Sequence, residues 1–172
     1  MHIILAPLQG VTEYPFRNAW SSFFSGLDTA YSPFIPCVTG TRVKPAHIRD
    51  VLPENNSNNL TLVPQLLGNN AGQMRLMIEA LARFGYKEVN WNMGCPSSTV
   101  VKRVRGCGLM QYPELVQSIL EELMPGLPVS LSVKLRLGVK SVDEMAQVLQ
   151  VLNRFPLLKI ILHPRLGIQQ YS

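Results

Sequence analysis

The sequence is poor in cysteine and has no long apolar run. Its 172 residues include 3 cysteines, and no two of them are spaced as CxxC. An odd number without that spacing argues against a disulfide framework and against a zinc site, so we expect no metal and a reducing, cytoplasmic location. No apolar stretch approaches the ~20 residues that cross a membrane. The N-terminus has no signal-peptide pattern, so we expect no membrane contact.

A glycine-rich GxGxxG turn is also missing after the first apolar run, at residues 3–6. That motif opens the dinucleotide-binding half of a doubly wound sheet. Its absence makes an open, six-stranded doubly wound sheet the weaker alternative to a barrel.

Acidic residues are absent between Val89 and Pro113, which leaves a run of uncompensated positive charge. The whole chain carries 16 Lys and Arg against 11 Asp and Glu, a formal charge of +5. Within the acid-free stretch lie Lys102, Arg103 and Arg105. These three residues, here called the basic loop, fit a polyanionic partner, but an ordinary solvated surface has the same composition.

Apolar, strand-like runs alternate with helical patterns along the chain. The predicted strands are Ile3–Ala6, Thr29–Tyr31, Leu62–Leu66, Glu88–Asn92, Val129–Leu135 and Lys159–Leu162. They read as continuous apolar runs, which is typical of a parallel sheet covered by helices. Their spacing of roughly 30 residues predicts an α/β protein with a (β/α)8 TIM barrel, truncated after about six strands.

Helix signals occupy the segments between these strands. Asn70 and Gln73 make a capping-box pair before an apolar helical face, and Ser141 and Glu144 make a second pair. Pro113 marks the first turn of another helix. Each helix therefore has a predicted start at the point where a crossover between parallel strands requires one.

Polar residues follow or interrupt most of the predicted strands, at the ends that meet at one mouth of a parallel barrel. They are Gln9, Gln65, Asn92, Cys95, Lys134 and His163. Lys134 is the most informative, because an ammonium group within an apolar strand is costly to bury without a partner. The set predicts a planar ligand with many hydrogen-bonding atoms across the mouth.

Cys95 stands in the run 90–96, Asn-Trp-Asn-Met-Gly-Cys-Pro, where a predicted strand ends and the backbone turns. An isolated buried cysteine is usually an inert apolar thiol. Gly94 permits the turn, and the two neighbouring amides favour a chemical role for this thiol.

Taken in order, these segments resemble the tRNA-dihydrouridine synthases, flavoenzymes with an FMN-binding barrel. The resemblance covers the whole chain. It rests on segments 6–12, 65–68, 92–96, 133–138 and 163–165, together with Phe16-Arg17 and Gln170-Tyr171.

The resemblance implies that FMN lies across the strand ends and that NADPH reduces it. The matching cofactor contacts are the backbone of Pro7, Leu8 and Gln9, the side chains of Gln65 and Lys134, and His163.

The resemblance also implies a tRNA substrate. Cys95 matches the proton donor for reduction of uracil, and Asn92 matches an amide that holds the base. We further expect contacts with tRNA from Arg136, Arg165 and the basic loop, although surface or structural roles remain open for all of them.

Several positions depart from the resembled pattern, among them Asn90, where an acid is common, and Leu8, where Met is common. The resemblance also places the FMN-phosphate contacts on two further barrel strands, followed by a helical tRNA-binding domain. Residues 1–172 are thus expected to be a partial FMN-binding barrel domain, inactive alone and monomeric at full length. Two alternatives remain: another FMN barrel oxidoreductase that acts on a free pyrimidine, and a non-catalytic remnant.

Overall fold

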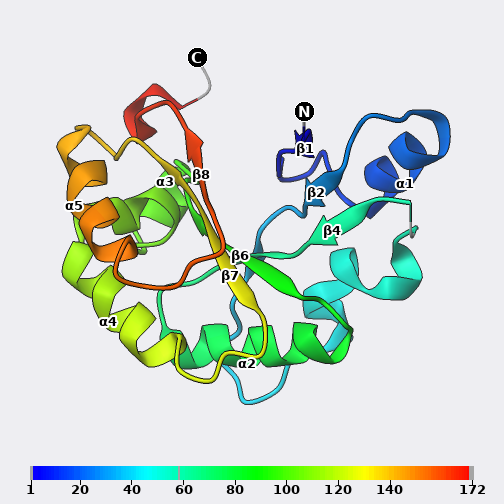
Figure 1. The fold of residues 1–172 in the computed structure, drawn as a ribbon, viewed down its shortest axis with the longest axis horizontal. Coiled ribbons are helices and arrows are strands. Elements are labelled where there is room, and N and C mark those ends of the chain that lie inside the picture. Colours follow the sequence, from blue (N-terminus) through cyan, green and yellow to red (C-terminus); the bar gives the residue numbers. More distant parts are fainter. Residues whose placement is uncertain (1, 58, 171–172) are drawn as a thin grey trace.

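The computed structural model describes residues 2–57 and 59–170, so Tyr171 of the last segment lies outside it. The chain is a mixed α/β protein (Figure 1). Its strands are β1 Ile4–Leu5, β2 Thr29–Tyr31, β3 Ile35–Pro36, β4 Thr61–Val63, β5 Gln65–Leu67, β6 Glu88–Met93, β7 Ser130–Arg136 and β8 Ile160–His163. Its α-helices are α1 Tyr14–Phe23, α2 Ala71–Arg83, α3 Ser98–Val101, α4 Pro113–Leu123 and α5 Asp143–Leu152. Short 3-10 helices are η1 Pro45–Val51, η2 Pro53–Asn55, η3 Gly106–Gln111 and η4 Gly167–Gln169.

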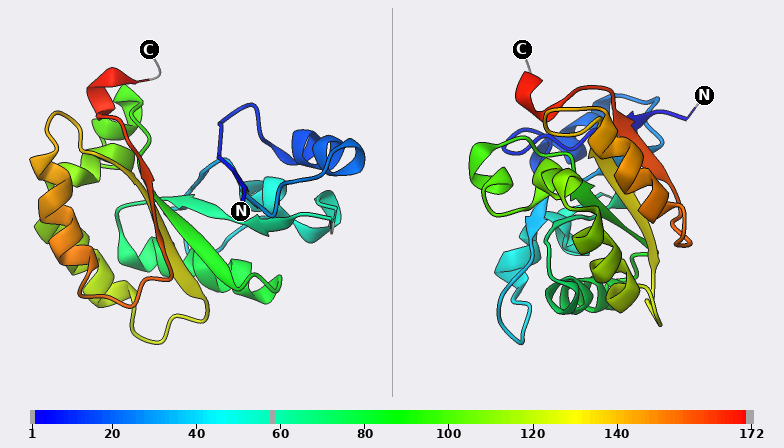
Figure 2. Two further views of the ribbon diagram at one scale, coloured as in Figure 1. Left: turned by 45° about the horizontal axis from the view of Figure 1, so that its top comes forward. Right: turned by 90° about the vertical axis from the view of Figure 1, so that its left-hand side faces the viewer.

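All strand pairs are parallel, in the orders β1-β2-β4 and β3-β5-β6-β7-β8. Within each of these two series the strands succeed one another in chain order, as in a barrel. The order never reverses, as it does in a doubly wound sheet. Among the described residues β1 and β8 do not pair with each other, so the sheet stays open (Figure 2). The predicted partial barrel is therefore confirmed.

The third predicted strand is divided into β4 and β5 at Pro64. Proline has no N–H to donate to the ladder. Next to the break, the N–H of Gln65 donates to Oγ of Ser32 at 2.9 Å instead of to a backbone carbonyl. The register also slips, because Tyr31 pairs with Val63 and Ile35 with Leu66, which is four residues on one strand against three on the other. This extra residue, as in a β-bulge, turns β5 toward β6.

Helices α2, α4 and α5 cover the outer side of β6, β7 and β8 (Figure 1). The side chain of Asn70 caps α2 by accepting the N–H of Gln73 at 2.9 Å, as predicted. The second predicted capping box is wrong: Glu144 accepts the N–H groups of Val139 and Lys140 and does not bond back to Ser141. Glu144 therefore holds the turn after β7 against the start of α5. None of the described helices is long and apolar enough to cross a membrane.

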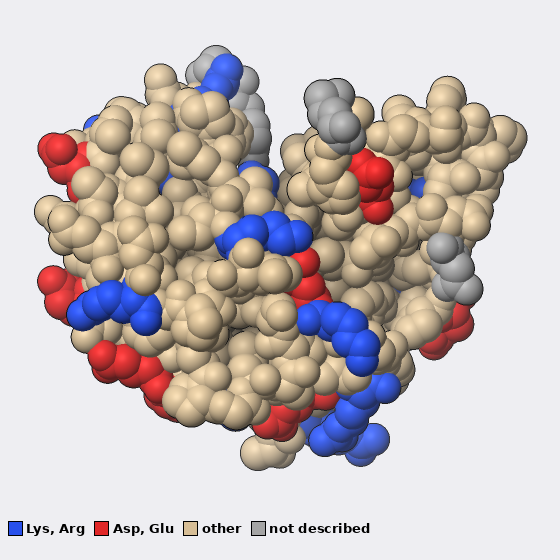
Figure 3. Space-filling model, viewed as in Figure 1, with Lys and Arg blue, Asp and Glu red and all other residues tan. Residues whose placement is uncertain are grey.

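Helix α1 was not predicted, and a buried ion pair anchors it. Arg17 is 2% exposed and donates to the carboxylate of Asp50 at 2.9 Å and to the carbonyl of Thr12 at 2.7 Å. Phe16, Trp20 and the following Phe24 stack along an adjacent face of α1. The surface over α1 carries few charges (Figure 3).

The two faces of β6 differ in chemistry. Val89, Trp91 and Met93 point into the apolar core under the helices. Residues 88, 90 and 92 alternate with them and point to the other side. The prediction that this strand is apolar throughout is therefore wrong for its inner face. In a parallel barrel that face points into the interior, which side chains from every strand fill. Here that interior is polar.

Candidate active site

A pocket opens between the segment after β1, the start of β5 and the C-terminal parts of β6, β7 and β8. It is lined by Pro7, Gln9, Phe34, Gln65, Asn92, Gly94, Cys95, Lys134, Arg136 and His163. Eight of these ten were predicted as site residues from the sequence, and the fold brings them together. Phe34 and Gly94 were not predicted to line the pocket. Phe34 lies in the irregular segment between β2 and β3, where strand periodicity gives no signal.

The carboxamide of Asn92 lies at the centre of this arrangement. Its Oδ1 accepts the backbone N–H groups of Gly94 at 3.1 Å and Cys95 at 2.9 Å, which shapes the turn that carries the thiol. Its Nδ2 donates to Oε1 of Gln65 at 2.7 Å. Both lone pairs of Oδ1 are used, so Asn92 can offer a ligand one remaining N–H and no acceptor.

A chain of hydrogen bonds continues from Gln65 into the barrel interior. Nε2 of Gln65 donates to Oδ1 of Asn90 at 2.7 Å, and Nδ2 of Asn90 donates to Oγ of Ser132 at 2.8 Å. Ser132 donates in turn to Oε1 of Glu88 at 2.6 Å. Gln65, Asn90 and Ser132 are all fully buried. We call the series from Asn92 to Glu88 the amide relay.

The far end of the amide relay is a carboxylate with three partners. Besides Ser132, the hydroxyl of Tyr31 donates to Oε1 of Glu88 at 3.0 Å, and Nζ of Lys159 lies 3.0 Å from Oε2. Burial and the neighbouring carboxylate raise the pKa of Tyr31, so its hydroxyl stays protonated and donates. Sequence reasoning did not assign Glu88, Asn90 or Ser132 to the site. The sequence signal that could have pointed to this network is a polar residue at every second position of β6.

The pocket is cationic. Burial lowers the pKa of Lys134, and the guanidinium of Arg136 lowers it further. Within residues 2–57 and 59–170, the ammonium of Lys134 has no hydrogen bond or ion pair. Burial and the cations Arg136, Lys134 and Arg165 lower the pKa of His163 as well, which keeps its ring neutral at pH 7. None of the ten lining residues is acidic. The pocket therefore suits a ligand with acceptor atoms or negative charge.

Cys95 is the accessible thiol of the three, since Cys37 is 5% exposed and Cys107 is fully buried. Burial raises the pKa of Cys95, although a hydrogen bond from the Ser97 backbone and the charge of Arg136 oppose this shift. A raised pKa leaves the thiol protonated near pH 7. In that state Cys95 can act as a general acid.

Arg136 is 1% exposed although it borders the pocket. Its Nε donates to the carbonyl of Gly94 at 2.9 Å, and its terminal nitrogens donate to the carbonyls of Leu166 and Gln170, each at 3.0 Å. Arg136 thus ties the Cys95 turn to β7 and to the segment after β8. Its predicted contact with tRNA stays a prediction.

The remaining predicted residues lie outside the pocket. Leu8 is 44% exposed, and its N–H donates to Oγ1 of Thr12 at 2.8 Å, so that backbone donor is already used. In the basic loop, Lys102 and Arg103 are exposed, whereas Arg105 is partly buried and donates to Asn69 at 3.2 Å. Arg165 follows β8 and is partly buried.

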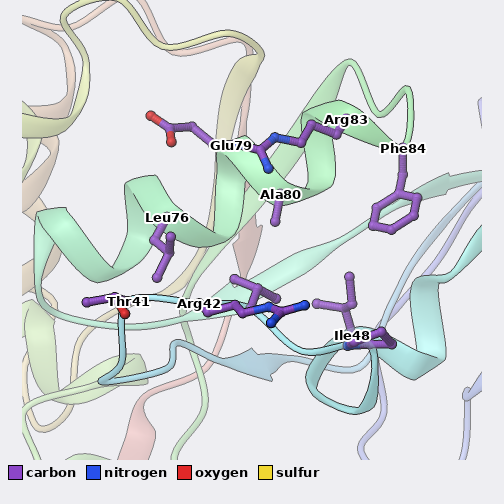
Figure 4. Close-up of a pocket in the computed structure, with 10 residues that line it drawn as sticks. Thr41, Arg42, Ile48, Leu76, Glu79, Ala80, Arg83 and Phe84 are labelled. Carbon is purple, nitrogen blue, oxygen red and sulfur yellow. The ribbon is translucent and has the colours of Figure 1, made fainter.

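A wider hollow lies between α2 and the segment 41–48 (Figure 4). It offers about 400 Å³, against about 90 Å³ for the pocket at the strand ends. Arg42, Glu79 and Arg83 border an apolar floor that includes Ile48 and Leu76. Its lining contains no thiol, no carboxamide and none of the predicted site residues. Size alone therefore does not identify the site.

An open parallel barrel that brings a thiol, three carboxamides and a lysine into one pocket has the layout of a TIM-barrel enzyme. Within the described part of the chain, no group of three or more His, Cys, Asp or Glu side chains could hold a metal ion. Comparison with known families gives a more specific assignment of the protein class. The chain belongs to the dihydrouridine synthase family, whose model matches residues 4–172.

Curated relatives agree with this assignment. The chain is 34% identical over 147 residues to a tRNA-dihydrouridine(16) synthase of Neisseria meningitidis, with 79% of this chain and 42% of the relative aligned. It is 34% identical over 143 residues to a probable tRNA-dihydrouridine synthase of Staphylococcus epidermidis, covering 82% of this chain and 43% of that protein. A probable tRNA-dihydrouridine synthase of Rhodobacter capsulatus aligns with 99% of this chain at 26% identity, over 52% of its own length. The chain thus spans about half the length of these relatives.

Proposed function

We propose that this chain forms the flavin-facing part of a cytoplasmic tRNA-dihydrouridine synthase, which uses NADPH and FMN to reduce the C5–C6 double bond of uridine in tRNA. The observation that carries the proposal is the ammonium of Lys134, which borders the pocket without a partner among the described residues. Beside it lie the carboxamides of Gln65 and Asn92 and the protonated thiol of Cys95.

The donor set of the pocket fits a flavin ring. The polar edge of that ring carries carbonyl oxygens and ring nitrogens that accept hydrogen bonds. Lys134 and the second N–H of Gln65 would hold this edge, and the lysine charge would favour the electron-rich reduced ring. FMN, when bound, supplies the hydride that reduction of uracil requires. Pro7, Gln9 and His163 would border the cofactor from the other strand ends.

Cys95 supplies the second half of the reduction. Adding hydrogen across a double bond takes one hydride and one proton, and the Sγ–H of Cys95 would give the proton to C5 of the base. The uridine must leave the tRNA stack to reach the pocket. Asn92, which has only an N–H to spare, would donate to a carbonyl oxygen of the base.

The proposal is tested first at Lys134, in the complete protein. Lys134→Ala should weaken FMN binding roughly tenfold to hundredfold, because a hydrogen bond to a charged group is lost. Lys140→Ala, an exposed lysine four residues after β7, serves as the matched control. Unchanged flavin content and unchanged NADPH oxidation in Lys134→Ala would make this lysine structural.

The second test separates the two half-reactions. Cys95→Ala should retain FMN and its reduction by NADPH, whereas reoxidation by tRNA should slow by roughly 10²–10⁴, the usual contribution of a general acid. Cys37→Ala and Cys107→Ala are the controls, because neither residue borders the pocket. Stopped-flow absorbance follows the flavin, and mass spectrometry counts dihydrouridine. Wild-type reoxidation in Cys95→Ala would remove the catalytic role.

The same assays decide between the alternatives. Reoxidation by free uracil but not by tRNA would favour a small-molecule pyrimidine reductase. A complete protein that binds no flavin would favour a non-catalytic remnant. We expect residues 1–172 alone to bind FMN weakly and to be inactive, since the family resemblance places the phosphate contacts elsewhere. Tight, stoichiometric FMN on these residues would contradict that expectation.

A further inference from the structure

We propose that Asn90 is a positioning residue that holds the carboxamide of Gln65, and that Ser132 and Glu88 orient Asn90 for this role. The inference rests on the proposed function in one respect, namely that Gln65 contacts the flavin. None of these three residues lines the pocket. They act on it through hydrogen bonds inside the barrel.

Ser132 and Glu88 set the orientation of the Asn90 carboxamide. The carboxylate of Glu88 can only accept, so Ser132 must direct its O–H toward it. The oxygen of Ser132 is then left as an acceptor, which Asn90 meets with Nδ2 at 2.8 Å. Asn90 must therefore turn Oδ1 toward Gln65, where it accepts from Nε2 at 2.7 Å.

The backbone of the turn at Gly94 and Cys95 independently sets the orientation of the Asn92 carboxamide. The backbone N–H groups of Gly94 and Cys95 can only donate, so Asn92 must present Oδ1 to them. Its Nδ2 then faces Gln65 and requires an acceptor there. The reversed orientation would set donor against donor in a buried site and leave both groups unpaired, which is unfavourable.

Both constraints act on the carboxamide of Gln65 and require the same orientation of it. Its oxygen faces Asn92 and its nitrogen faces Asn90, so the carboxamide cannot flip without breaking both bonds. The groups left free are consequently one N–H on Gln65, one N–H on Asn92 and one lone pair on Oε1 of Gln65. The resembled pattern commonly has an acid at position 90. An aspartate there could still accept from Gln65, with the Ser132 hydroxyl turned from Glu88 to the second carboxylate oxygen, and Glu88 would keep Tyr31 and Lys159. An apolar side chain could not accept from Gln65.

This difference defines the test. Asn90→Leu removes the acceptor at similar size, and Asn90→Asp keeps it. In uniformly 15N-labelled chain without flavin, one side-chain N–H of Gln65 should exchange slowly in wild type and in Asn90→Asp. In Asn90→Leu its exchange should accelerate roughly fivefold to tenfold, the equivalent of one lost hydrogen bond. If Asn90→Leu does not fold, Asn90→Ser makes the same test, because its side chain ends one carbon earlier.

A merely structural role would give a different pattern. General loosening would also accelerate backbone exchange in the core of α4, for example at Leu120, and these amides should keep their wild-type rates. Ser130→Ala, on the same strand and face as Ser132 but exposed, should change nothing. Wild-type exchange of Gln65 in the folded Asn90→Leu or Asn90→Ser variant would overturn the proposal.

The flavin arm uses the complete protein. The dissociation constant of FMN should rise roughly tenfold in Asn90→Leu and stay within about twofold in Asn90→Asp. Equal affinities in both variants would contradict the positioning role. A complete protein that binds no flavin would overturn the proposed function instead, while the exchange experiment would still decide whether Asn90 holds Gln65.

Discussion

Nε of Arg136 donates to the carbonyl of Gly94 at 2.9 Å, which joins the end of β7 to the turn that carries Cys95. The same guanidinium binds the carbonyls of Leu166 and Gln170. One buried side chain thus fixes three backbone segments around the thiol. Losing this side chain removes a charge-assisted donor from each of the three carbonyls.

Arg136→Met should therefore lower the free energy of unfolding by about 2–4 kcal/mol, because several charge-assisted hydrogen bonds are lost from a buried site. Arg103→Met is the matched control: the side chain is exposed, and the change should stay within about 0.5 kcal/mol. Urea unfolding followed by circular dichroism measures both. A midpoint for Arg136→Met equal to that of the control would mean that water replaces these bonds.

Native-state alkylation should distinguish the three thiols. Cys95 is accessible and the other two are buried, so iodoacetamide should label Cys95 first. Because burial raises its pKa, the reactive thiolate is scarce at pH 7 and the rate should still be rising above pH 9, which is the ordinary value. Peptide mass spectrometry gives the site and the rate. Equal labelling of Cys37 or Cys107 in folded protein would contradict the burial order.

His163 should titrate below its ordinary pKa, because burial and three cations disfavour the charged ring. The folded state then prefers the neutral form. Its contribution to stability is present above about pH 6.5 and is lost as the pH falls below that value toward the folded-state pKa. Nuclear magnetic resonance of the ring protons measures the midpoint. Lys134→Met should raise that midpoint by removing one repelling charge, whereas Lys140→Met should leave it unchanged.

Neutralising the basic loop to glutamine, at Lys102, Arg103 and Arg105 together, should weaken tRNA binding by the complete protein. The slope of log K against log salt should become shallower by roughly 2, since each phosphate contact contributes about 0.7–0.9. Flavin reduction by NADPH should not change.

The control for the basic loop removes three exposed cations near the opposite, N-terminal end of the barrel strands: Arg83, Lys87 and Arg154. This triple glutamine variant should keep the wild-type slope. Equal slopes for the two triple variants would make the basic loop an ordinary solvated surface.

Features that are local along the chain could be predicted from the amino-acid sequence. The βα alternation, the helix starts at Asn70 and Pro113, and the Cys95 turn depend on neighbouring residues, so their patterns could be read directly. The placement of Lys134 at the mouth followed from the rule that parallel strands end at one edge. These local signals were enough to predict most of the residues that line the pocket.

The contacts that hold these residues in place depend on tertiary packing and could not be predicted. Gln65 and Asn90 bond across 25 residues of sequence, and Arg136 reaches Gly94 across 42. No local pattern encodes such pairs, because strand pairing and register decide which inward side chains meet. The division of the third strand at Pro64 likewise depends on a ladder partner. Sequence identified the chemical groups of the site, and three-dimensional packing assigned each group its donor, its acceptor and its orientation.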